Sequence, residues 1–334
     1  MDLGLLIEWI IKSVILLLIC VTGFAYLTLY ERKALARIQV RVGPNRAGPG
    51  GWLQPAADAV KLIFKEELIP AEAYKIVFVL APIITVIPAL VILAVLPWGT
   101  SITLFGREIS LYLTDINVGV LYIVSITSIS VYGIVLAGWS SNNKYAMLGG
   151  MRSTAQMISY ELALGLAFIG PIMLAGSMSL GDIVEAQKPI WFVIYQPLGA
   201  LIFFIAVLAE VNRAPFDMPE AEQELTAGYH TEYSGMKFAL FFMAEYIKMI
   251  AVSAVAATLF FGGYRGPFVD QLPILGPLYL LIKILLMLFF MIWVRATLPR
   301  LRYDRLMAFG WKILLPAAFI NVLATAVVLV LIGG

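Results

Sequence analysis

Carboxylates gather in one short segment of this chain. Residues 209–233 read AEVNRAPFDMPEAEQELTAGYHTEY and lie between two long apolar runs. This segment and one position just downstream hold seven of the chain's 21 acidic residues within 36 positions: Glu210, Asp217, Glu220, Glu222, Glu224, Glu232 and Glu245. The three at positions 220, 222 and 224 are close enough in sequence to influence one another's protonation.

Proton transfer is the chemistry that such a group favours. If residues 219–225 form a helix, Glu220 and Glu224 share a face while Glu222 points elsewhere. Repulsion between like charges and removal from water both raise the pKa of a carboxyl group, and neighbouring groups titrate as a coupled set. An ordinary solvated acidic loop is the alternative. The proton path is favoured because apolar residues interleave the acids: Pro215, Phe216, Met218, Pro219, Leu225 and Tyr229.

Cysteine and histidine are too few for a redox centre on this chain. Cys20 and His230 are the only residues of their types, so ligands for an iron–sulfur cluster or a bis-histidine haem are lacking. Cys20 is expected to pack as a small hydrophobe and His230 to be structural. The sequence has no phosphate-binding loop, nucleophile elbow or metal-binding spacing, although carboxylates alone could bind a hard cation. Electrons for any redox reaction must come from another chain.

The composition is that of an integral membrane protein. Hydrophobic residues make up 61% of the 334 and charged residues 13%, whereas a soluble domain has about 25% charged residues. A bilayer core of about 30 Å needs roughly 20 apolar residues per helix. We predict an all-α, single polytopic domain over residues 1–334. Eight spans are expected at about 10–30, 75–98, 116–140, 155–176, 189–210, 237–262, 273–295 and 311–332.

The distribution of basic residues predicts the topology. With eight crossings, segments 31–75, 141–156, 211–237 and 295–312 fall on one side of the membrane. That side holds 17 lysines and arginines, whereas the other holds only Arg107, Lys188 and Arg265. Because lysine and arginine mark the cytoplasmic side, both termini are expected on the outer, periplasmic side of the cell membrane.

The first cytoplasmic segment, residues 31–75, is too long for a simple turn. Glycines and prolines break it at 43–51, and the sequence WLQPAADAVKLIFKEELIP follows. Pro55 suits a first helical turn, and apolar residues recur at three-to-four spacing after it. We predict an amphipathic helix near 55–66 that lies in the membrane surface. A helix packed against protein is the alternative.

Charged residues inside predicted spans are costly and usually mark function. They are Lys12, Glu161, Glu245, Lys248 and Lys283. Lys12 lies four residues after Glu8 and can pair with it or extend to the interface. Glu245 and Lys248 are three residues apart, so they could form a structural ion pair or act in a proton relay. The sequence gives no partner for Lys283.

Three long stretches make the chain similar to a known family. They are YERKALARIQVRVGPNRAGPGGWLQPAADAVKLIFKEE, GWSSNNKYAMLGGMRSTAQMISYELALGLA and AEVNRAPFDMPEAEQELTAGYHTEYSGMKFALFFMAEY. In this order they resemble the H subunit of bacterial NADH–quinone oxidoreductase, or respiratory complex I, whose mitochondrial counterpart is subunit 1. The resemblance covers essentially the whole chain and agrees with eight spans and outward termini.

The resemblance implies a membrane subunit that forms the membrane end of a quinone tunnel. Quinone is then the substrate, while FMN, NADH chemistry and iron–sulfur clusters belong to partner subunits. The implied partners are peripheral-arm subunits, which carry the terminal cluster and the head-group site, small and antiporter-like membrane-arm subunits, and membrane lipid; nucleic acid is not expected. The tunnel residues implied are Glu31, Arg32, Asp58, Glu210, Arg213, Phe216 and Asp217. The proton-path residues implied are Glu161, Glu220, Glu222, Glu224 and Glu245.

Three other functions remain open from sequence. The nearest is the homologous subunit of a membrane-bound hydrogenase or of a dehydrogenase that uses ferredoxin or a deazaflavin. A secondary transporter would favour inverted repeats, and no convincing internal repeat is found. A passive membrane anchor would leave the charged residues in the spans unexplained.

Overall fold

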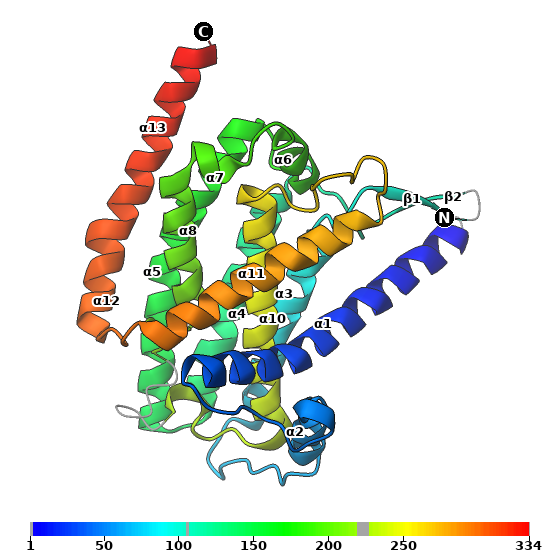
Figure 1. The fold of residues 1–334 in the computed structure, drawn as a ribbon. Helices are drawn as coiled ribbons and strands as arrows, with labels where there is room; N and C mark the ends of the chain where they lie inside the picture. Colours follow the sequence, from blue (N-terminus) through cyan, green and yellow to red (C-terminus); the bar gives the residue numbers. More distant parts are fainter. Residues whose placement is uncertain (1–2, 105–106, 219–226, 334) are drawn as a thin grey trace.

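The computed structural model describes residues 3–104, 107–218 and 227–333. Helices dominate this part of the chain, and one short hairpin is the only sheet within it (Figure 1). The elements are α1 (Leu3–Ile38), η1 (Pro49–Gly51), α2 (Gln54–Ile63), α3 (Lys75–Ile92), η2 (Leu93–Val95), β1 (Ser101–Leu104), β2 (Arg107–Ser110), α4 (Gly119–Ser140), α5 (Lys144–Ala175), α6 (Leu180–Ala186), α7 (Phe192–Tyr195), α8 (Pro197–Glu210), η3 (Gly228–His230), α10 (Gly235–Phe260), α11 (Leu275–Thr297), α12 (Tyr303–Phe309), η4 (Gly310–Leu314) and α13 (Leu315–Gly333).

The predicted fold class is confirmed: the chain is an all-α integral membrane protein. Within the described residues, seven helical segments are long and apolar enough to cross a membrane. The fifth predicted span, 189–210, is built differently. Its helix α8 has only 14 residues, about 21 Å at 1.5 Å per residue. Pro197 starts this helix, and the non-helical Gln196 separates it from the short α7.

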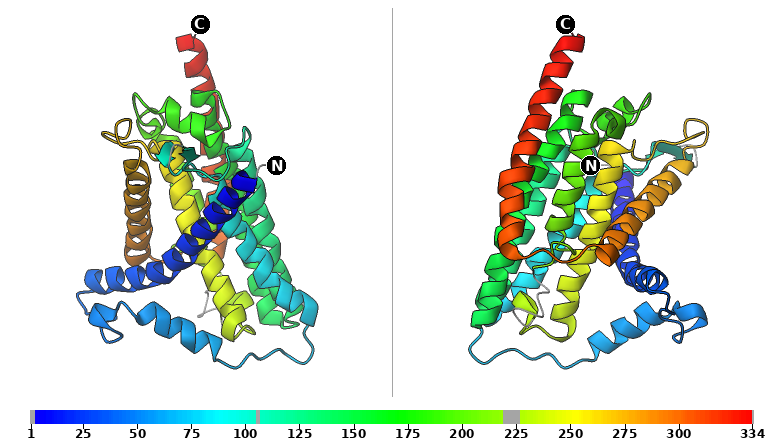
Figure 2. Two further views of the ribbon diagram at one scale, coloured as in Figure 1. Left: turned by 90° about the vertical axis from the view of Figure 1, so that its right-hand side faces the viewer. Right: turned by 60° about the vertical axis from the view of Figure 1, so that its left-hand side comes forward.

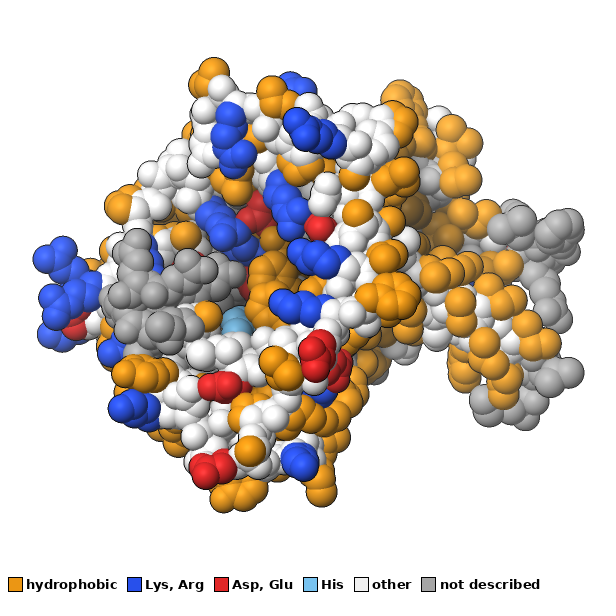
Figure 3. All heavy atoms as spheres, turned by 90° about the horizontal axis from the view of Figure 1, so that it is seen from below, with side chains coloured by type: hydrophobic (Ala, Val, Ile, Leu, Met, Phe, Trp, Pro, Cys, Tyr) orange, Lys and Arg blue, Asp and Glu red, His pale blue; other side chains and the backbone are white. Residues whose placement is uncertain are grey.

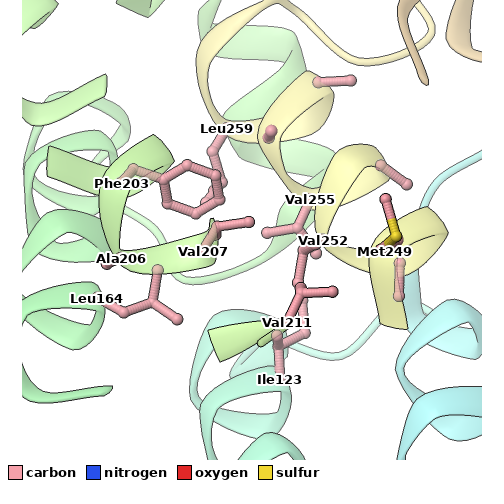
Figure 4. Close-up of a cluster of buried hydrophobic side chains, with 14 of the residues drawn as sticks. Ile123, Leu164, Phe203, Ala206, Val207, Val211, Met249, Val252, Val255 and Leu259 are labelled. Atoms are coloured by element: carbon pink, nitrogen blue, oxygen red, sulfur yellow. The ribbon is translucent and has the colours of Figure 1, made fainter. Parts of the chain in front are cut away.

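Helix α10 lies at the centre of the bundle. Its middle section is rich in small residues, which let neighbouring helices approach closely, and it contacts α1, α3, α8 and α11. Figure 4 shows Val252, Val255 and Leu259 of this helix on the side of the α8 side chains, with Ile123 of α4 and Leu164 of α5 nearby. This contact places the end of α8 beside the middle of α10.

Helices α1 and α13 lie at the edges of the bundle. In the most apolar stretch of α1 only 6% of the residues are buried within the protein, against 61% in that of α10. Its N-terminal half leans away from the other helices, toward the β1–β2 hairpin (Figures 1 and 2). Both chain ends lie away from α2 in these views. Large parts of α1 are therefore available to lipid or to partners.

The helix predicted near 55–66 is present as α2. It begins at Gln54, with Pro55 in its first turn, and ends at Ile63. None of its residues is buried, and Val60, Ile63 and the adjoining Phe64 are exposed. The apolar side of α2 is thus uncovered by this chain, as a helix that lies on a membrane requires.

Two intramembrane lysines have clear partners. Lys12 lies 2.6 Å from the Glu8 carboxylate, as its spacing predicted, and donates to Ser110 Oγ at 2.9 Å. Lys283 Nζ donates to the carbonyl oxygens of three residues beyond the end of α10, each at 2.7 Å: Phe261, Gly263 and Arg265. Lys283 thus satisfies three backbone carbonyls of the loop that follows α10.

Candidate functional site

Arg213 is the centre of a buried charged cluster. It lies in the turn after α8, and only 3% of its side chain is exposed. Its Nη1 lies 3.4 Å from Oε1 of Glu31 on α1, and its Nε lies 2.9 Å from Oε1 of Glu245 on α10. The guanidinium stands over the Tyr246 ring at 4.4 Å. Arginine suits this position because its planar fork can serve two carboxylates and stack on an aromatic ring.

The electrostatics of this cluster favour the charged arginine. Burial alone lowers the pKa of Arg213, but the carboxylates of Glu245 and Glu31 outweigh it and raise the pKa above its ordinary value. Glu31 also pairs with Arg295 at the end of α11. The cluster therefore ties together α1, α10, α11 and the turn after α8.

Glu210 and Lys248 form a second buried pair. Glu210 ends α8 and is 1% exposed, and its Oε1 lies 2.5 Å from Lys248 Nζ on α10. Lys248 also donates to Ser130 Oγ of α4 at 3.2 Å. The ion pair between Glu245 and Lys248 that the sequence allowed is not formed. On α10 the two side chains serve different partners, Arg213 and Glu210, which both come from the end of α8 and the turn after it.

A small polar cavity connects the two pairs. Its volume is about 30 Å³, enough for a water molecule, which needs roughly 10–15 Å³ by this kind of measure. Its polar lining comes from α3, α4, α8, the turn after α8, and α10, and includes Thr85, Ser130, Glu210, Asn212, Glu245 and Lys248. Water in this cavity can therefore contact carboxylates of both pairs.

Glu161 is a further acidic residue near these pairs, and it lies on α5, beside α4. It is half-buried on α5, and its carboxylate accepts a hydrogen bond from Ser128 of α4. Ser128 is two residues before Ser130, the partner of Lys248. Helix α4 thus presents one hydroxyl to Glu161 and another to Lys248, the partner of Glu210.

Gln156 of α5 holds the turn that carries Arg213. Its Nε2 lies 2.8 Å from the Ala209 carbonyl, 2.7 Å from the Phe216 carbonyl and 3.2 Å from Asn212 Oδ1. The ring of Phe216 packs on Tyr160 one turn further along α5, with ring centroids 5.3 Å apart. The sequence showed Gln156 only as a polar residue inside a predicted span.

The remaining predicted tunnel residues lie apart from this cluster. Arg32 faces α2, and its Nη1 lies 2.9 Å from Asp58 Oδ2. Asp217 is half-buried beside Phe216. The predictions for Glu220, Glu222 and Glu224 fall outside the described residues, as does the helix considered for 219–225. The structure therefore brings Glu31, Glu210, Arg213 and Glu245 together and places Arg32 with Asp58 at a second location.

His230 has the environment expected of a structural residue. Its ring lies 3.8 Å from that of Tyr229 and 5.6 Å from that of Phe241, measured between centroids. Burial lowers the pKa of His230 to about 3, so the imidazole is neutral at physiological pH. It does not exchange protons there.

An apolar cavity of about 400 Å³ lies between α1 and α11, with Ile250 of α10 at its base. Tyr26, Tyr30 and Lys33 of α1 and Trp52 just before α2 line one end of it. Leu288 of α11 also lines it, and Arg295 lies two turns further along that helix, on the same side. The cavity thus leads from the lipid-facing helices toward the charged cluster.

The positions that sequence reasoning missed share one property. Gln156, Ser128, Ser130 and Arg295 are polar residues whose partners are distant in sequence. Arg295 stood among the basic residues of a predicted cytoplasmic segment. Its pairing with Glu31 depends on the packing of α11 against α1, which no local pattern specifies.

Comparison with known proteins gives a consistent result. The family described as NADH dehydrogenase matches residues 11–326. An H subunit of NADH-quinone oxidoreductase from Geobacter metallireducens is 52% identical over 320 residues, which is 96% of each chain. The H subunit from Thermomicrobium roseum is 51% identical over 98% of each chain, and that from Protochlamydia amoebophila is 52% identical over 91% of this chain and 92% of its own. The chain belongs to the family of H subunits of NADH-quinone oxidoreductase, the respiratory complex I.

Proposed function

We propose that this chain forms the membrane part of the quinone tunnel and the start of a carboxylate path that couples quinone reduction to proton translocation. The observation that carries the proposal is the Glu31–Arg213–Glu245 cluster, whose Glu31 directly follows Tyr30 of the cavity lining on α1. A lipid-soluble substrate and a titratable network then meet in one place. The complex to which such subunits belong is an oxidoreductase that translocates protons.

The apolar cavity suits the tail of a quinone. Its volume of about 400 Å³ lies within the range of about 300–1,000 Å³ found for small-molecule sites. Its lining is almost entirely aliphatic and aromatic, as an isoprenoid chain requires. Helix α2 lies beside its inner end and frames an entrance at the level of the membrane surface.

The carboxylate path begins where the cavity ends. Glu31, Arg213 and Glu245 form its first part, the water-sized cavity leads on to Glu210 and Lys248, and the hydroxyls of α4 lead to Glu161. In the described part of the chain, Oε2 of Glu31 and of Glu210 is buried without a hydrogen-bond partner. Each of these oxygens is available to water or to a proton. Glu220, Glu222 and Glu224 are proposed members of the same path.

The coupling step is electrostatic. Reduction of quinone, or the charge on its product, changes the protonation of the carboxylates nearest to it, because buried charges interact strongly at short range. The groups respond as a coupled set, and the change passes through Glu245 and Glu161 toward antiporter-like partner subunits. Iron–sulfur clusters and FMN on peripheral partners supply the electrons, and the immediate proton donors to quinone lie on those partners.

The basic face of the molecule is the proposed contact with the peripheral arm. Figure 3 shows lysine and arginine side chains around an apolar patch on the face seen from below. This face belongs to the segments predicted to be cytoplasmic. The termini then lie on the periplasmic side, and the chain is a multi-pass subunit of the cell membrane.

Obstruction of the apolar cavity tests the tunnel. Leu285 lines the cavity, whereas the adjacent Leu286 is 61% exposed and does not. In the assembled complex, Leu285→Trp is expected to raise KM for long-tailed quinones about tenfold, the effect of about 1.4 kcal/mol. KM for a short-chain, water-soluble quinone should change less. Leu286→Trp is the control and should behave as wild type; equal kinetics of both variants with every quinone would refute the tunnel assignment.

A further inference from the structure

A second apolar groove lies at the opposite end of α1 and plays no part in the proposed tunnel. Its volume is about 620 Å³. One wall is a single face of α1, on which Ile7, Ile11, Ile15 and Ile19 recur at every fourth position. The other wall is the end of β2 and the residues after it, Ile109–Leu113, together with Trp98 and Pro277. The N-terminal half of α1 leans toward the hairpin (Figures 1 and 2), and the groove lies between the two.

The groove contains one cation and one anion. Lys12 and Glu8 are one helical turn apart on the α1 wall, and both line the groove. Their side chains are 18% and 30% exposed. The Ser110 hydroxyl faces Lys12 from the hairpin at 2.9 Å. Beyond Lys12, the α1 wall is apolar for about 10 Å, from Lys12 to Ile19 at 1.5 Å per residue.

We propose that this groove binds a zwitterionic aminophospholipid, such as phosphatidylethanolamine, from the outer leaflet. Its phosphate lies at Lys12 and the Ser110 hydroxyl, its ammonium lies at Glu8, and an acyl chain follows Ile15 and Ile19. The charges of the groove match both charges of this head group, whereas an anionic lipid would place uncompensated charge beside Glu8. A concave apolar wall also loses dispersion contacts unless a chain fills it.

The site is independent of the quinone tunnel, although the two cavities share Ile19 and Trp98 at their boundary. The outer-leaflet assignment follows from the topology that the basic residues predict.

Lipid retention by the assembled complex tests the proposal. The purified complex is incubated with equal amounts of phosphatidylethanolamine and phosphatidylglycerol in detergent and repurified, and the lipids and quinone retained per complex are quantified by mass spectrometry. Ile15→Trp fills the groove, and Ile10→Trp is the matched control because Ile10 is 54% exposed and lies outside the lining. We expect Ile15→Trp to lose one phosphatidylethanolamine per complex and Ile10→Trp to lose none.

The head-group assignment has its own variant. Glu8→Gln removes the partner of the ammonium and should reduce the preference for phosphatidylethanolamine over phosphatidylglycerol about fivefold. This variant decides the question if Ile15→Trp fails to assemble. An unchanged preference in Glu8→Gln, equal retention by the two tryptophan variants, or retention of phosphatidylglycerol or quinone in place of the aminophospholipid would overturn the proposal.

Discussion

At the scale of single residues, the site depends on how each buried charge is compensated. Arg213 serves two carboxylates, and Lys248 serves Glu210. An ion buried in this way stays charged only because its partner is close. Removal of one member therefore disturbs every group bonded to it, whereas loss of an exposed pair does little.

Arg213→Met should be strongly destabilising. It leaves Glu31 and Glu245 without their shared cation, and removal of one partner from a buried pair costs about 3–5 kcal/mol. We expect less assembled complex and a lower midpoint of thermal unfolding. Arg32→Met is the matched control, because the Arg32–Asp58 pair is more exposed and should contribute about 0–1 kcal/mol. Equal midpoints for the two variants would contradict the central role given to Arg213.

His230 should make stability depend on pH. Its pKa is lowered to about 3 in the fold and is about 6.5 in an unfolded chain. As the pH falls below about 6.5, the unfolded state binds a proton that the folded state excludes, so stability is lost progressively toward pH 3. At pH 5.5 the expected loss is about 1.4 kcal/mol.

The measurement is the thermal midpoint of the complex at pH 7.5 and pH 5.5. His230→Gln cannot titrate, so its midpoint should fall less between the two pH values than that of the wild type. A wild-type midpoint that falls no more than that of the variant would show that His230 is not buried in its neutral form.

At the scale of elements, sequence predicted the helices better than their ends. Apolar length alone was enough to find α1, α3, α4, α5, α10, α11 and α13. It did not predict that α5 begins at Lys144, because polar residues of that helix are buried against other segments. It also overestimated the fifth span, because Gln196 and Pro197 interrupt the apolar run without changing its hydrophobicity.

The acidic residues of the site were predictable from the sequence, but their partners were not. Glu161 and Glu245 stood out because charge in a span is costly, and Glu210 because it belongs to the acidic segment. Their partners could not be chosen from spacing: Glu245 and Lys248 are neighbours on α10, yet each pairs with a group from the region of α8. Gln156 carries no charge, so its role required knowledge of which carbonyls face α5.

Gln156→Leu should loosen the turn between α8 and the acidic segment. The substitution removes the donor for the Ala209 and Phe216 carbonyls. The Ala209 carbonyl keeps the bond from the Asn212 N–H, whereas the Phe216 carbonyl loses the bond from Gln156, and a buried group left unpaired costs about 1–3 kcal/mol. We expect a lower thermal midpoint and a reduced kcat with quinone. Gln156→Glu cannot donate in its charged form and should do no better. Wild-type activity and stability in both variants would show that the turn holds without this clamp.

At the scale of the whole molecule, two environments meet around α10. The outer surfaces of α1 and α11 are apolar, and the charged cluster is buried within the bundle; lysines and arginines gather on the face seen from below (Figure 3). The central helix touches both, because Ile250 lines the apolar cavity and Glu245 and Lys248 line the polar one. In the proposed function, events at the quinone reach the path of carboxylates across about one turn of this helix.

Proton translocation by a Glu161→Gln complex tests the coupling path most directly. Glutamine keeps the size of the side chain and can still accept from Ser128, but it cannot carry a proton. In inverted membrane vesicles, NADH oxidation by quinone and proton uptake are recorded together after assembly has been verified. Glu66→Gln, at an exposed position, is the control.

The account predicts that Glu161→Gln lowers proton uptake at least as much as NADH oxidation, while Glu66→Gln leaves both unchanged. Full oxidation with full proton uptake in Glu161→Gln would contradict the proposal that this row of carboxylates couples quinone reduction to proton movement.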